Sequence, residues 1–378
     1  MKSRTILTLA TFAPAELGDT IMATALYRAL RVAYPEARYT VLSQLPDHPV
    51  LAGLDVFDEV VFYDPAMDLA ANFDLVVLPV LCGDNEVRSH FDTHPALVSA
   101  DRLFAKERRG LLNKWDGRYS HVLFYRHQVE MNEELARAAG YEGSALPLFC
   151  PQGWVENFEQ HRGSVGLFIN TPANKFQALP NRQWPREHWQ ALVSRLGAAN
   201  VLLVGGPTDR PNVEELANAT GAPFVVTTSL AELTGLCQVL RALVTTDGGA
   251  MHAAATTPVP IVSLHGTSSP ILLHPWIYPQ GKCIAVVSPN SCSPCQRSYR
   301  LKLCENGVTQ MDCMQNIKPE LVARALGEFD RVEAGTCLIM KGERLYTKDA
   351  YLRSSKRRFE FTLNYNVARA ALRLLPSH

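Results

Sequence analysis

The sequence predicts an α/β fold built from two doubly wound, Rossmann-like domains that face a central cleft. Short apolar runs with the length of buried strands alternate with segments of helical periodicity in both halves of the chain. The length of 378 residues suffices for two domains that each bury a core. Residues 147–163 interrupt the alternation with prolines, glycines and mixed charges. We therefore expect a first domain over 1–150, a linker over 151–163 and a second domain over 164–331.

The first domain opens with a strand, a loop and a long helix. An apolar strand is expected over residues 5–10, and a helix over 21–32 that Pro35 ends. Asp19 either caps this helix or stands as a carboxylate at the mouth of the cleft. Because Gly18 is the single glycine of the loop, the G-x-G-x-x-G fingerprint of dinucleotide-binding dehydrogenases is missing. Further strands are expected over 39–42, 56–62 and 75–80, and a helix over 123–139.

The second domain contains the most informative stretch of the chain, residues 241–267. A strand over 243–245 ends in Asp247-Gly248-Gly249, and a short helix over 250–255 leads to a strand over 261–264. Ligands of open α/β sheets bind at the carboxyl ends of the strands, where Asp247 lies. The two glycines allow a ligand close to the backbone, and His252 lies within the first turn or so of the helix. The alternative is a structural turn with a core histidine.

The remaining elements of the second domain follow the same alternation. Strands are expected over 165–169, 201–204 and 224–226, and helices from 185 or 186 to 196, over 213–220 and over 230–240. The loop over 170–184 carries Thr171, Lys175 and Arg182 near a strand end, which suits a phosphate group. A solvated loop with no specific partner is the alternative.

Composition excludes several classes of protein. Lys+Arg and Asp+Glu both number 37, so the chain has no global basic field for nucleic acid. No apolar run approaches the ~20 residues of a membrane span. The N-terminal segment fits a first strand better than a signal peptide, which predicts a cytoplasmic protein.

Four of the nine cysteines, Cys292, Cys295, Cys304 and Cys313, cluster within residues 292–313. Four soft ligands that begin with C-x2-C form a complete tetrahedral set for zinc or iron. Such a site would be structural and would hold a loop with little core of its own. Four reduced thiols in a loop are the alternative. Cys82, Cys150 and Cys237 lie in apolar surroundings and are expected to be inert.

Four motifs in the correct order resemble the ADP-heptose:lipopolysaccharide heptosyltransferases, glycosyltransferase family nine. They are Leu17-Gly18-Asp19-Thr20 with the helix after it, Arg182-Gln183-Trp184-Pro185 with His188-Trp189, Asp247-Gly248-Gly249-Ala250-Met251-His252, and the segment from Pro258 to Thr267. Gly248 stands where the family usually has threonine, and Thr24 where proline is common. The cysteine-rich segment is also similar to that of the autotransporter heptosyltransferases, which bind iron.

The resemblance implies a GT-B fold and inverting transfer of a heptosyl unit from ADP-heptose, without a catalytic metal. The acceptor would bind in the N-terminal half and the ADP-sugar donor in the C-terminal half, with Asp19 as the base. For such a reaction, we expect these roles at the donor site: Arg182, Thr171 and Lys175 would neutralise the pyrophosphate, Gly248 and Gly249 would offer it backbone N–H groups, His252 would contact phosphate or ribose, Asp247 would orient the sugar or the turn, and Asp209 would reach the ribose. The acceptor is left open between a lipopolysaccharide core, another glycan, lipid-linked or not, and a protein.

Residues 332–378 lie outside the resemblance and are expected to form a tail with a helix that packs back on the N-terminal domain. The basic run over 353–358 has two alternative roles, as a solvated face or as a peripheral contact with the anionic inner membrane. Two other functions stay open on the same fold. One is a sugar-nucleotide epimerase or hydrolase that uses Glu16 with Asp19, and the other is a sugar-nucleotide-binding protein without transfer activity.

Overall fold

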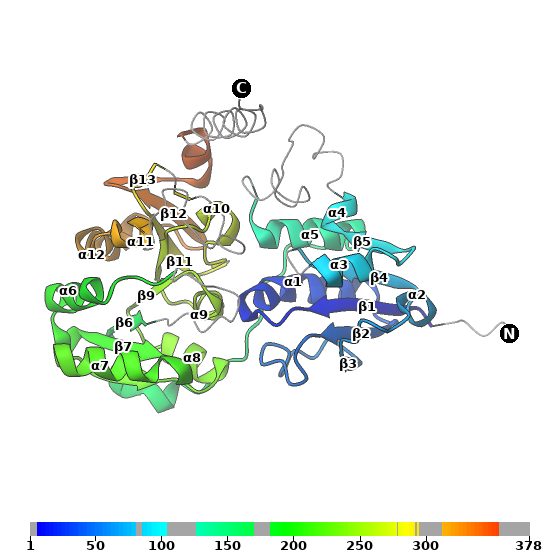
Figure 1. The fold of residues 1–378 in the computed structure, drawn as a ribbon, viewed down its shortest axis with the longest axis horizontal. Helices are drawn as coiled ribbons and strands as arrows, with labels where there is room; N and C mark the ends of the chain where they lie inside the picture. Colours follow the sequence, from blue (N-terminus) through cyan, green and yellow to red (C-terminus); the bar gives the residue numbers. More distant parts are fainter. Residues whose placement is uncertain are drawn as a thin grey trace, which may run out of the picture.

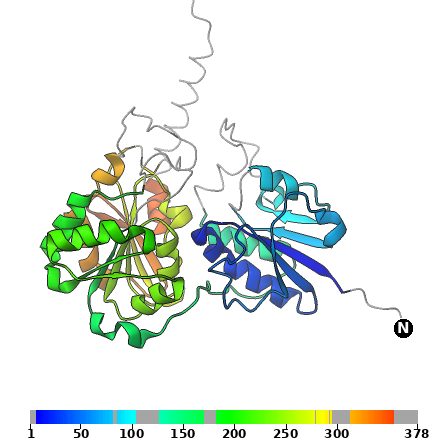
Figure 2. The same cartoon turned by 60° about the horizontal axis from the view of Figure 1, so that its bottom comes forward.

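The computed structural model describes residues 6–80, 85–103, 126–169, 182–277, 279–291, 293–294 and 312–354. These residues form two α/β lobes, each with its own sheet (Figure 1). Seen from a second direction, the lobes lie side by side, with α1 of the first lobe turned toward the second (Figure 2). The prediction of two doubly wound sheets is confirmed.

The first sheet has the order β3-β2-β1-β4-β5, and all its strands are parallel. Its strands are β1 (Thr8–Ala13), β2 (Arg38–Ser43), β3 (Glu59–Phe62), β4 (Leu75–Leu78) and β5 (Leu97–Ser99). Its helices are α1 (Leu17–Ala33), α2 (Leu69–Asn72), α3 (Asn85–Phe91), α4 (Ala100–Leu103) and α5 (Gln128–Ala138). The strand order reverses between β1 and β4, so a crevice opens at their carboxyl ends.

The second sheet repeats this order and extends it, as β13-β12-β11-β10-β9-β6-β7-β8. Its strands are β6 (Val165–Phe168), β7 (Val201–Gly205), β8 (Phe224–Val226), β9 (Ala242–Thr246), β10 (Ile261–His265), β11 (Lys282–Val287), β12 (Thr336–Lys341) and β13 (Arg344–Tyr346). Its helices are α6 (Arg186–Leu196), α7 (Arg210–Thr220), α8 (Leu230–Cys237), α9 (Gly249–Ala254), α10 (Pro270–Leu273), α11 (Asp312–Gln315) and α12 (Pro319–Gly327). Only the edge pair β12–β13 is antiparallel among the described strands. Here the order reverses between β6 and β9.

Alternation along the strands divides the core of the second lobe. In β11, Cys283, Ala285 and Val287 belong to one buried cluster, and Ile284 and Val286 belong to another. The first of these clusters also contains residues of α1 and α5, so the buried apolar side chains continue from one lobe into the other. The second cluster contains α6, α11 and α12 and covers the far face of the sheet.

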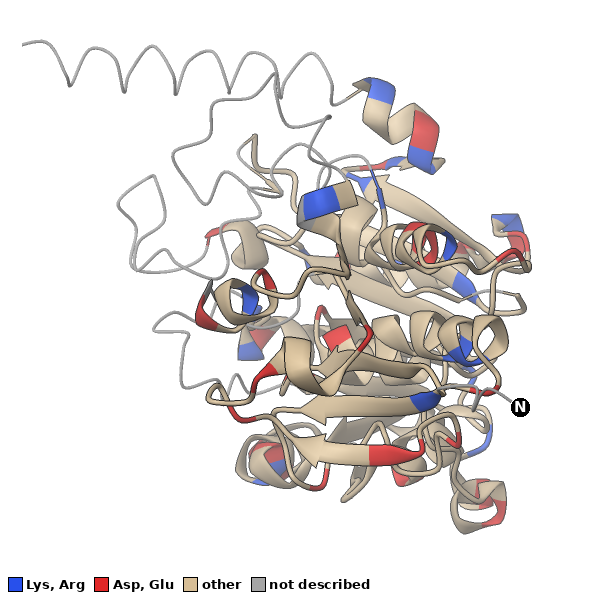
Figure 3. Cartoon of the chain, turned by 90° about the vertical axis from the view of Figure 1, so that its right-hand side faces the viewer, with Lys and Arg blue, Asp and Glu red and all other residues tan. Residues whose placement is uncertain are grey.

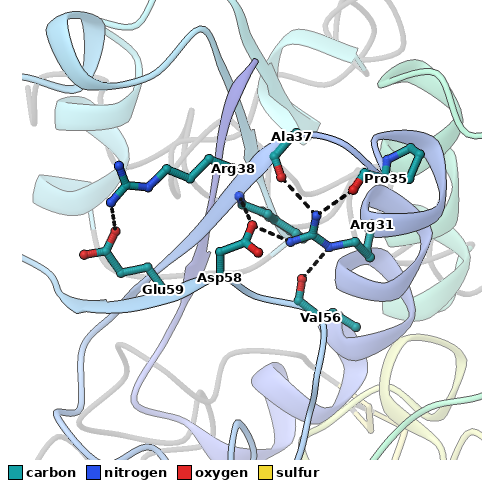
Figure 4. Close-up of polar contacts among 8 residues, drawn as sticks. Arg31, Pro35, Ala37, Arg38, Val56, Asp58 and Glu59 are labelled. Atoms are coloured by element: carbon teal, nitrogen blue, oxygen red, sulfur yellow. Dashed lines mark hydrogen bonds and ion pairs between the residues drawn. The ribbon is translucent and has the colours of Figure 1, made fainter. Parts of the chain in front are cut away.

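The C-terminal end of α1 is fixed by Arg31, which contacts four neighbours at once (Figure 4). Its guanidinium donates to the carbonyls of Val56 at 2.8 Å and Ala37 at 3.0 Å, and pairs with Asp58 at 2.7 Å. Asp58 also accepts from the Tyr39 backbone N–H at 2.7 Å. These bonds hold α1 against β2, and α1 carries Asp19 at its other end.

The structure differs from the sequence prediction in several places, and the strands β5 and β11 were not predicted. Asp19 is not the cap of α1, because the helix begins at Leu17 with Glu16 as its N-cap, and Asp19 is the acidic residue of the first turn. Residues 336–346, expected in the tail, form β12 and β13 at the edge of the second sheet. The linker region contains the 3-10 helix Val155–His161. Basic and acidic segments are interspersed over the described helices (Figure 3).

Candidate active site between the two lobes

The N-terminal ends of α1 and α9 meet between the lobes, which brings two of the sequence motifs together. A Cβ atom placed on Gly18 would lie 2.8 Å from the His252 ring, and one placed on Gly249 would lie 3.2 Å from Cβ of Leu17. Both helices follow strands that border the point where the strand order of their sheet reverses. The glycines are therefore needed for the close approach of the two lobes at this site.

Asp19 is a partly exposed carboxyl group whose charge is disfavoured by its surroundings. The side-chain amide of Gln128 donates a hydrogen bond to its Oδ1 atom at 3.1 Å. Burial, with the nearby negative charges of Glu16 and Asp247, raises the pKa of Asp19 to about 7, although Gln128 and Arg182 oppose the shift. A carboxyl group with this pKa exchanges a proton easily at neutral pH, which suits a general base.

Arg182 and Asp247 form a largely buried ion pair across the carboxyl ends of β6 and β9. The Arg182 Nε and Asp247 Oδ2 atoms lie 3.4 Å apart, with exposed side-chain fractions of 19% and 3%. Burial alone would raise the pKa of Asp247, but Arg182, His265 and His252 together lower it. Asp247 is thus ionised, and it holds the cation of Arg182 at the edge of the sheet where ligands bind.

His252 is buried and neutral. Burial, with the charge of Arg182, lowers its pKa to about 4, against the opposing effect of Asp247. Its Nδ1 atom is buried without a hydrogen-bond partner in the structure. A neutral ring with an open nitrogen can donate to or accept from a ligand hydroxyl or phosphate oxygen.

The other predicted donor-site residues have different positions. Asp209 is buried after β7, two strands away from β9, and accepts the backbone N–H of Gly206 at 2.8 Å, so it holds its own turn. Gly248 is the N-cap of α9, and its carbonyl accepts from the His252 backbone at 3.3 Å. Thr171 and Lys175 lie outside the described residues.

The predicted metal site falls mostly outside the described residues as well. Of its ligands, Cys292, Cys295 and Cys304 are not described, and Cys313 is buried at α11 beside Gly266. Within the described ranges, no group of three or more His, Cys, Asp and Glu side chains could hold a metal ion. The same part of the chain contains no helix that is long and apolar enough to span a membrane.

Sequence analysis missed two residues of this site. Gln128 contacts Asp19 from 109 positions further along the chain, and no local pattern marks it. His265, at the end of β10, lies among Ser263 and Ser268 and helps to lower the pKa of Asp247. The family-like segment over 258–267 contains His265, so the motif gave a signal for it that was not used.

Comparisons with known proteins identify relatives of this chain. Residues 104–304 match the model of Glycosyltransferase family 9 (heptosyltransferase). The chain is 26% identical over 296 residues to lipooligosaccharide heptosyltransferase 2 of Haemophilus influenzae, which covers 68% of this chain and 82% of the relative.

Solved structures with the same fold include two glycosyltransferases. A family 9 glycosyl transferase from Veillonella parvula aligns over 85% of this chain and 97% of its own, with a TM-score of 0.58 and 18% identity. The E. coli heptosyltransferase WaaC with ADP aligns over 85% and 99%, with a TM-score of 0.54 and 14% identity. The fold is therefore GT-B, and the family model spans more than half of the sequence. The chain belongs to glycosyltransferase family 9, the heptosyltransferases, and is a transferase.

Proposed function

We propose that this protein transfers a heptosyl unit from ADP-heptose to a hydroxyl group of a lipopolysaccharide core or another glycan, with inversion at the anomeric carbon. The observation that carries the proposal is Asp19, a carboxyl group with a pKa of about 7 at the junction of the two lobes. An inverting transfer needs one base that takes the proton of the acceptor hydroxyl as it attacks. Asp19 is that base, and Gln128 orients its Oδ1 atom.

The departing ADP needs positive charge and hydrogen-bond donors at its diphosphate. Arg182 supplies the charge, and its position beside Asp247 keeps it at the sheet edge. Thr171 and Lys175 from the same loop add to it, and Gly248 and Gly249 let the diphosphate approach the backbone of α9. His252 binds a phosphate or ribose oxygen through its open ring nitrogen. Asp209 is a weaker candidate for the ribose, since its carboxylate already holds the Gly206 turn.

Donor choice and catalysis are tested separately with wild type and Asp19→Asn. Both proteins are heated with ADP-heptose, ADP-glucose, UDP-glucose and GDP-mannose, and a ligand at a hundredfold its Kd should stabilise by about 2.7 kcal/mol. We expect stabilisation of both proteins by ADP-heptose and loss of transfer in the variant alone. If no ADP-sugar stabilises either protein, the proposed donor is wrong. If Asp19→Asn retains full transfer activity, Asp19 is not the base. A panel of lipopolysaccharide core and unglycosylated autotransporter protein then decides the acceptor class.

We also propose a structural zinc or iron ion bound by Cys292, Cys295, Cys304 and Cys313. The four soft ligands and the burial of Cys313 against the second lobe support it. Elemental analysis of the purified protein should find about one equivalent of metal per chain, and much less in Cys295→Ser. We further propose a cytoplasmic location with peripheral contact to the inner membrane through the basic run over 353–358.

A further inference from the structure

Cys283 and Cys337 form a thiol pair in the second sheet, separate from Asp19. The two residues are register partners in the parallel strands β11 and β12, so their side chains leave the same face of the sheet. Their Sγ atoms lie 2.8 Å apart, and both residues are free thiols. Cys283 is fully buried, whereas Cys337 is partly exposed. Neighbouring strands also hold Cα atoms at a separation that a disulfide can span.

His274 lies beside this pair, and the two thiols differ strongly in pKa. Burial would raise the pKa of Cys337, but the hydrogen bond with Cys283 and the positive charge of His274 lower it to about 6. The pKa of His274 is raised by Cys337 against the effect of burial. Burial and the neighbouring Cys337 raise the pKa of Cys283 well above that of a free thiol. The two pKa values thus move in opposite directions, which favours the thiolate on the more exposed sulfur, Cys337, and the thiol on Cys283 behind it.

The chain contains a second buried pair that lacks this arrangement. Cys150 and Cys237 lie close enough for the charge of Cys150 to act on Cys237. Burial raises the pKa of both thiols to about 12, and no cation offsets it. A thiolate is the reactive form of cysteine, so the two pairs should differ strongly in reactivity.

We propose that Cys283 and Cys337, with His274, form a hydroperoxide-reactive site that closes to a reversible disulfide. The Cys337 thiolate attacks the terminal oxygen of the hydroperoxide, so an S–O bond forms and the O–O bond breaks. The released alkoxide, or hydroxide from hydrogen peroxide, takes a proton from water and leaves Cys337 as a sulfenic acid. The Cys283 sulfur then attacks the Cys337 sulfur, the S–S bond forms, and the S–O bond breaks with loss of water. Two thiol sulfurs are oxidised and the hydroperoxide is reduced, and an external dithiol reverses the step.

The position of the site connects it to the first turn of α5, which holds Gln128, the hydrogen-bond partner of Asp19. The backbone carbonyl of His274 accepts a hydrogen bond from His127 Nε2 at 2.8 Å, across the two lobes. His127 caps α5, and the next residue, Gln128, donates to Asp19. Disulfide formation removes the negative charge beside His274. Because Cys337 raises the pKa of His274, that pKa should then fall and the ring should become neutral. Oxidation should therefore lower transfer activity; this consequence, unlike the disulfide itself, rests on the proposed function.

The test treats reduced full-length protein with increasing hydrogen peroxide and maps its peptides by mass spectrometry without reduction. We expect a cross-linked peptide pair that contains Cys283 and Cys337 and that dithiothreitol separates. Cys150 and Cys237 should remain unmodified at the same dose. In Cys283→Ser, Cys337 should accumulate as a sulfenic acid that dimedone traps. His274→Gln should slow this trapping by about tenfold or more, because less of Cys337 is then thiolate.

Absence of the cross-link at a peroxide excess, or equal oxidation of Cys150, overturns the site. Transfer assays on the same samples separate the second claim. Wild type should lose activity on oxidation and regain it with dithiothreitol, whereas Cys337→Ser should respond to neither. A cross-link that forms without change in transfer overturns the connection to Asp19 and leaves the peroxide site standing. Failure of the proposed transfer reaction would not affect the peptide map.

Discussion

At the scale of single residues, the chemistry depends on which carboxyl groups are charged. Asp19 and Asp247 are close enough to influence one another, yet their pKa values move in opposite directions. Asp247 lies beside Arg182, whereas Asp19 is compensated mainly by the neutral amide of Gln128. Asp247 is therefore a permanent anion that holds the cation of Arg182, and Asp19 is a group that exchanges protons.

Transfer should therefore depend on the ionisation of Asp19. The base acts when deprotonated, so kcat/KM should rise with pH and level off above an apparent pKa of about 7. Glu16→Gln should shift this limb to lower pH, because the charge of Glu16 raises the pKa of Asp19. Asp19→Asn should reduce kcat by about 10² to 10⁴-fold. An acid limb that stays in the ordinary carboxyl range in wild type would contradict the assignment.

The same ionisation predicts a pH-dependent change in stability. The pKa of Asp19 is higher in the folded chain than the ordinary 3.8, so its contribution is fully present below that value and is lost as pH rises through about 7. Asn carries no charge that needs solvation. Asp19→Asn should therefore raise Tm relative to wild type above pH 7, with the difference shrinking toward acid. Thermal unfolding of both proteins over a pH series measures this, and a difference that does not vary with pH would disprove it.

The Arg182–Asp247 pair should behave as a buried pair. Removal of the guanidinium in Arg182→Ala leaves Asp247, which is 3% exposed, without its cation, at a cost of about 3 to 5 kcal/mol of unfolding free energy. The double variant Arg182→Ala/Asp247→Asn should regain much of that stability but not donor affinity. Denaturant unfolding and ADP titration separate the two effects. Equal loss of stability in the single and double variants would show that the pair is not what holds this turn.

At the scale of elements, the site depends on how closely α1 approaches α9. Alanine at position 18 would favour the helix slightly, yet its Cβ would lie 2.8 Å from the His252 ring. Gly18→Ala should thus destabilise by about 1 to 3 kcal/mol and lower kcat, since the end of α1 that carries Asp19 must move. Gly327→Ala is the matched control, because Gly327 ends α12 and its Cβ would contact nothing within 4 Å. Comparable unfolding curves for the two variants would refute the packing argument.

At the scale of the whole molecule, the sequence predicted elements well and contacts between distant elements poorly. Residue types alone placed β8 over Phe224–Val226 and α6 from Arg186 to Leu196, because turn residues punctuate both. The sequence did not predict β5 and β11, and it placed the residues of β12 and β13 in a tail because they lie beyond the family resemblance.

The residues of the site also fall into those that the sequence could predict and those that it could not. Asp19, Arg182, Asp247 and His252 could be predicted because each follows a strand of a parallel sheet, and the carboxyl ends of such strands share one edge. A capping role for Asp19 stayed open as an alternative, since the start of α1 at Leu17 has no capping side chain to mark it. Gln128 could not be predicted, because only the packing of α5 on α1 brings it to Asp19. His274 could not be predicted either, because it meets α5 only across the two lobes.

That packing leads to a final prediction about the lobes. Lys348, in the helical residues 348–354 after β13, pairs with Glu130 of α5 at 2.5 Å. Glu130 also accepts the His127 backbone N–H at 2.8 Å, so the first turn of α5 is tied to the second lobe at two points. A partly exposed pair of this kind contributes only about 1 kcal/mol to stability. Loss of this pair should instead act mainly on catalysis, because the pair helps to position Gln128 and, through Gln128, Asp19.

Lys348→Met should leave Tm nearly unchanged and lower kcat by up to about tenfold, since small displacements of a catalytic group reduce rates strongly. ADP affinity should not change, because Arg182, Asp247 and His252 all belong to the second lobe. Lys282→Met is the control, because Lys282 donates to the Phe329 carbonyl at 3.1 Å within the second lobe. A fall in ADP affinity with unchanged kcat would show that the Lys348–Glu130 contact serves the donor site, and the argument through α5 would then fail.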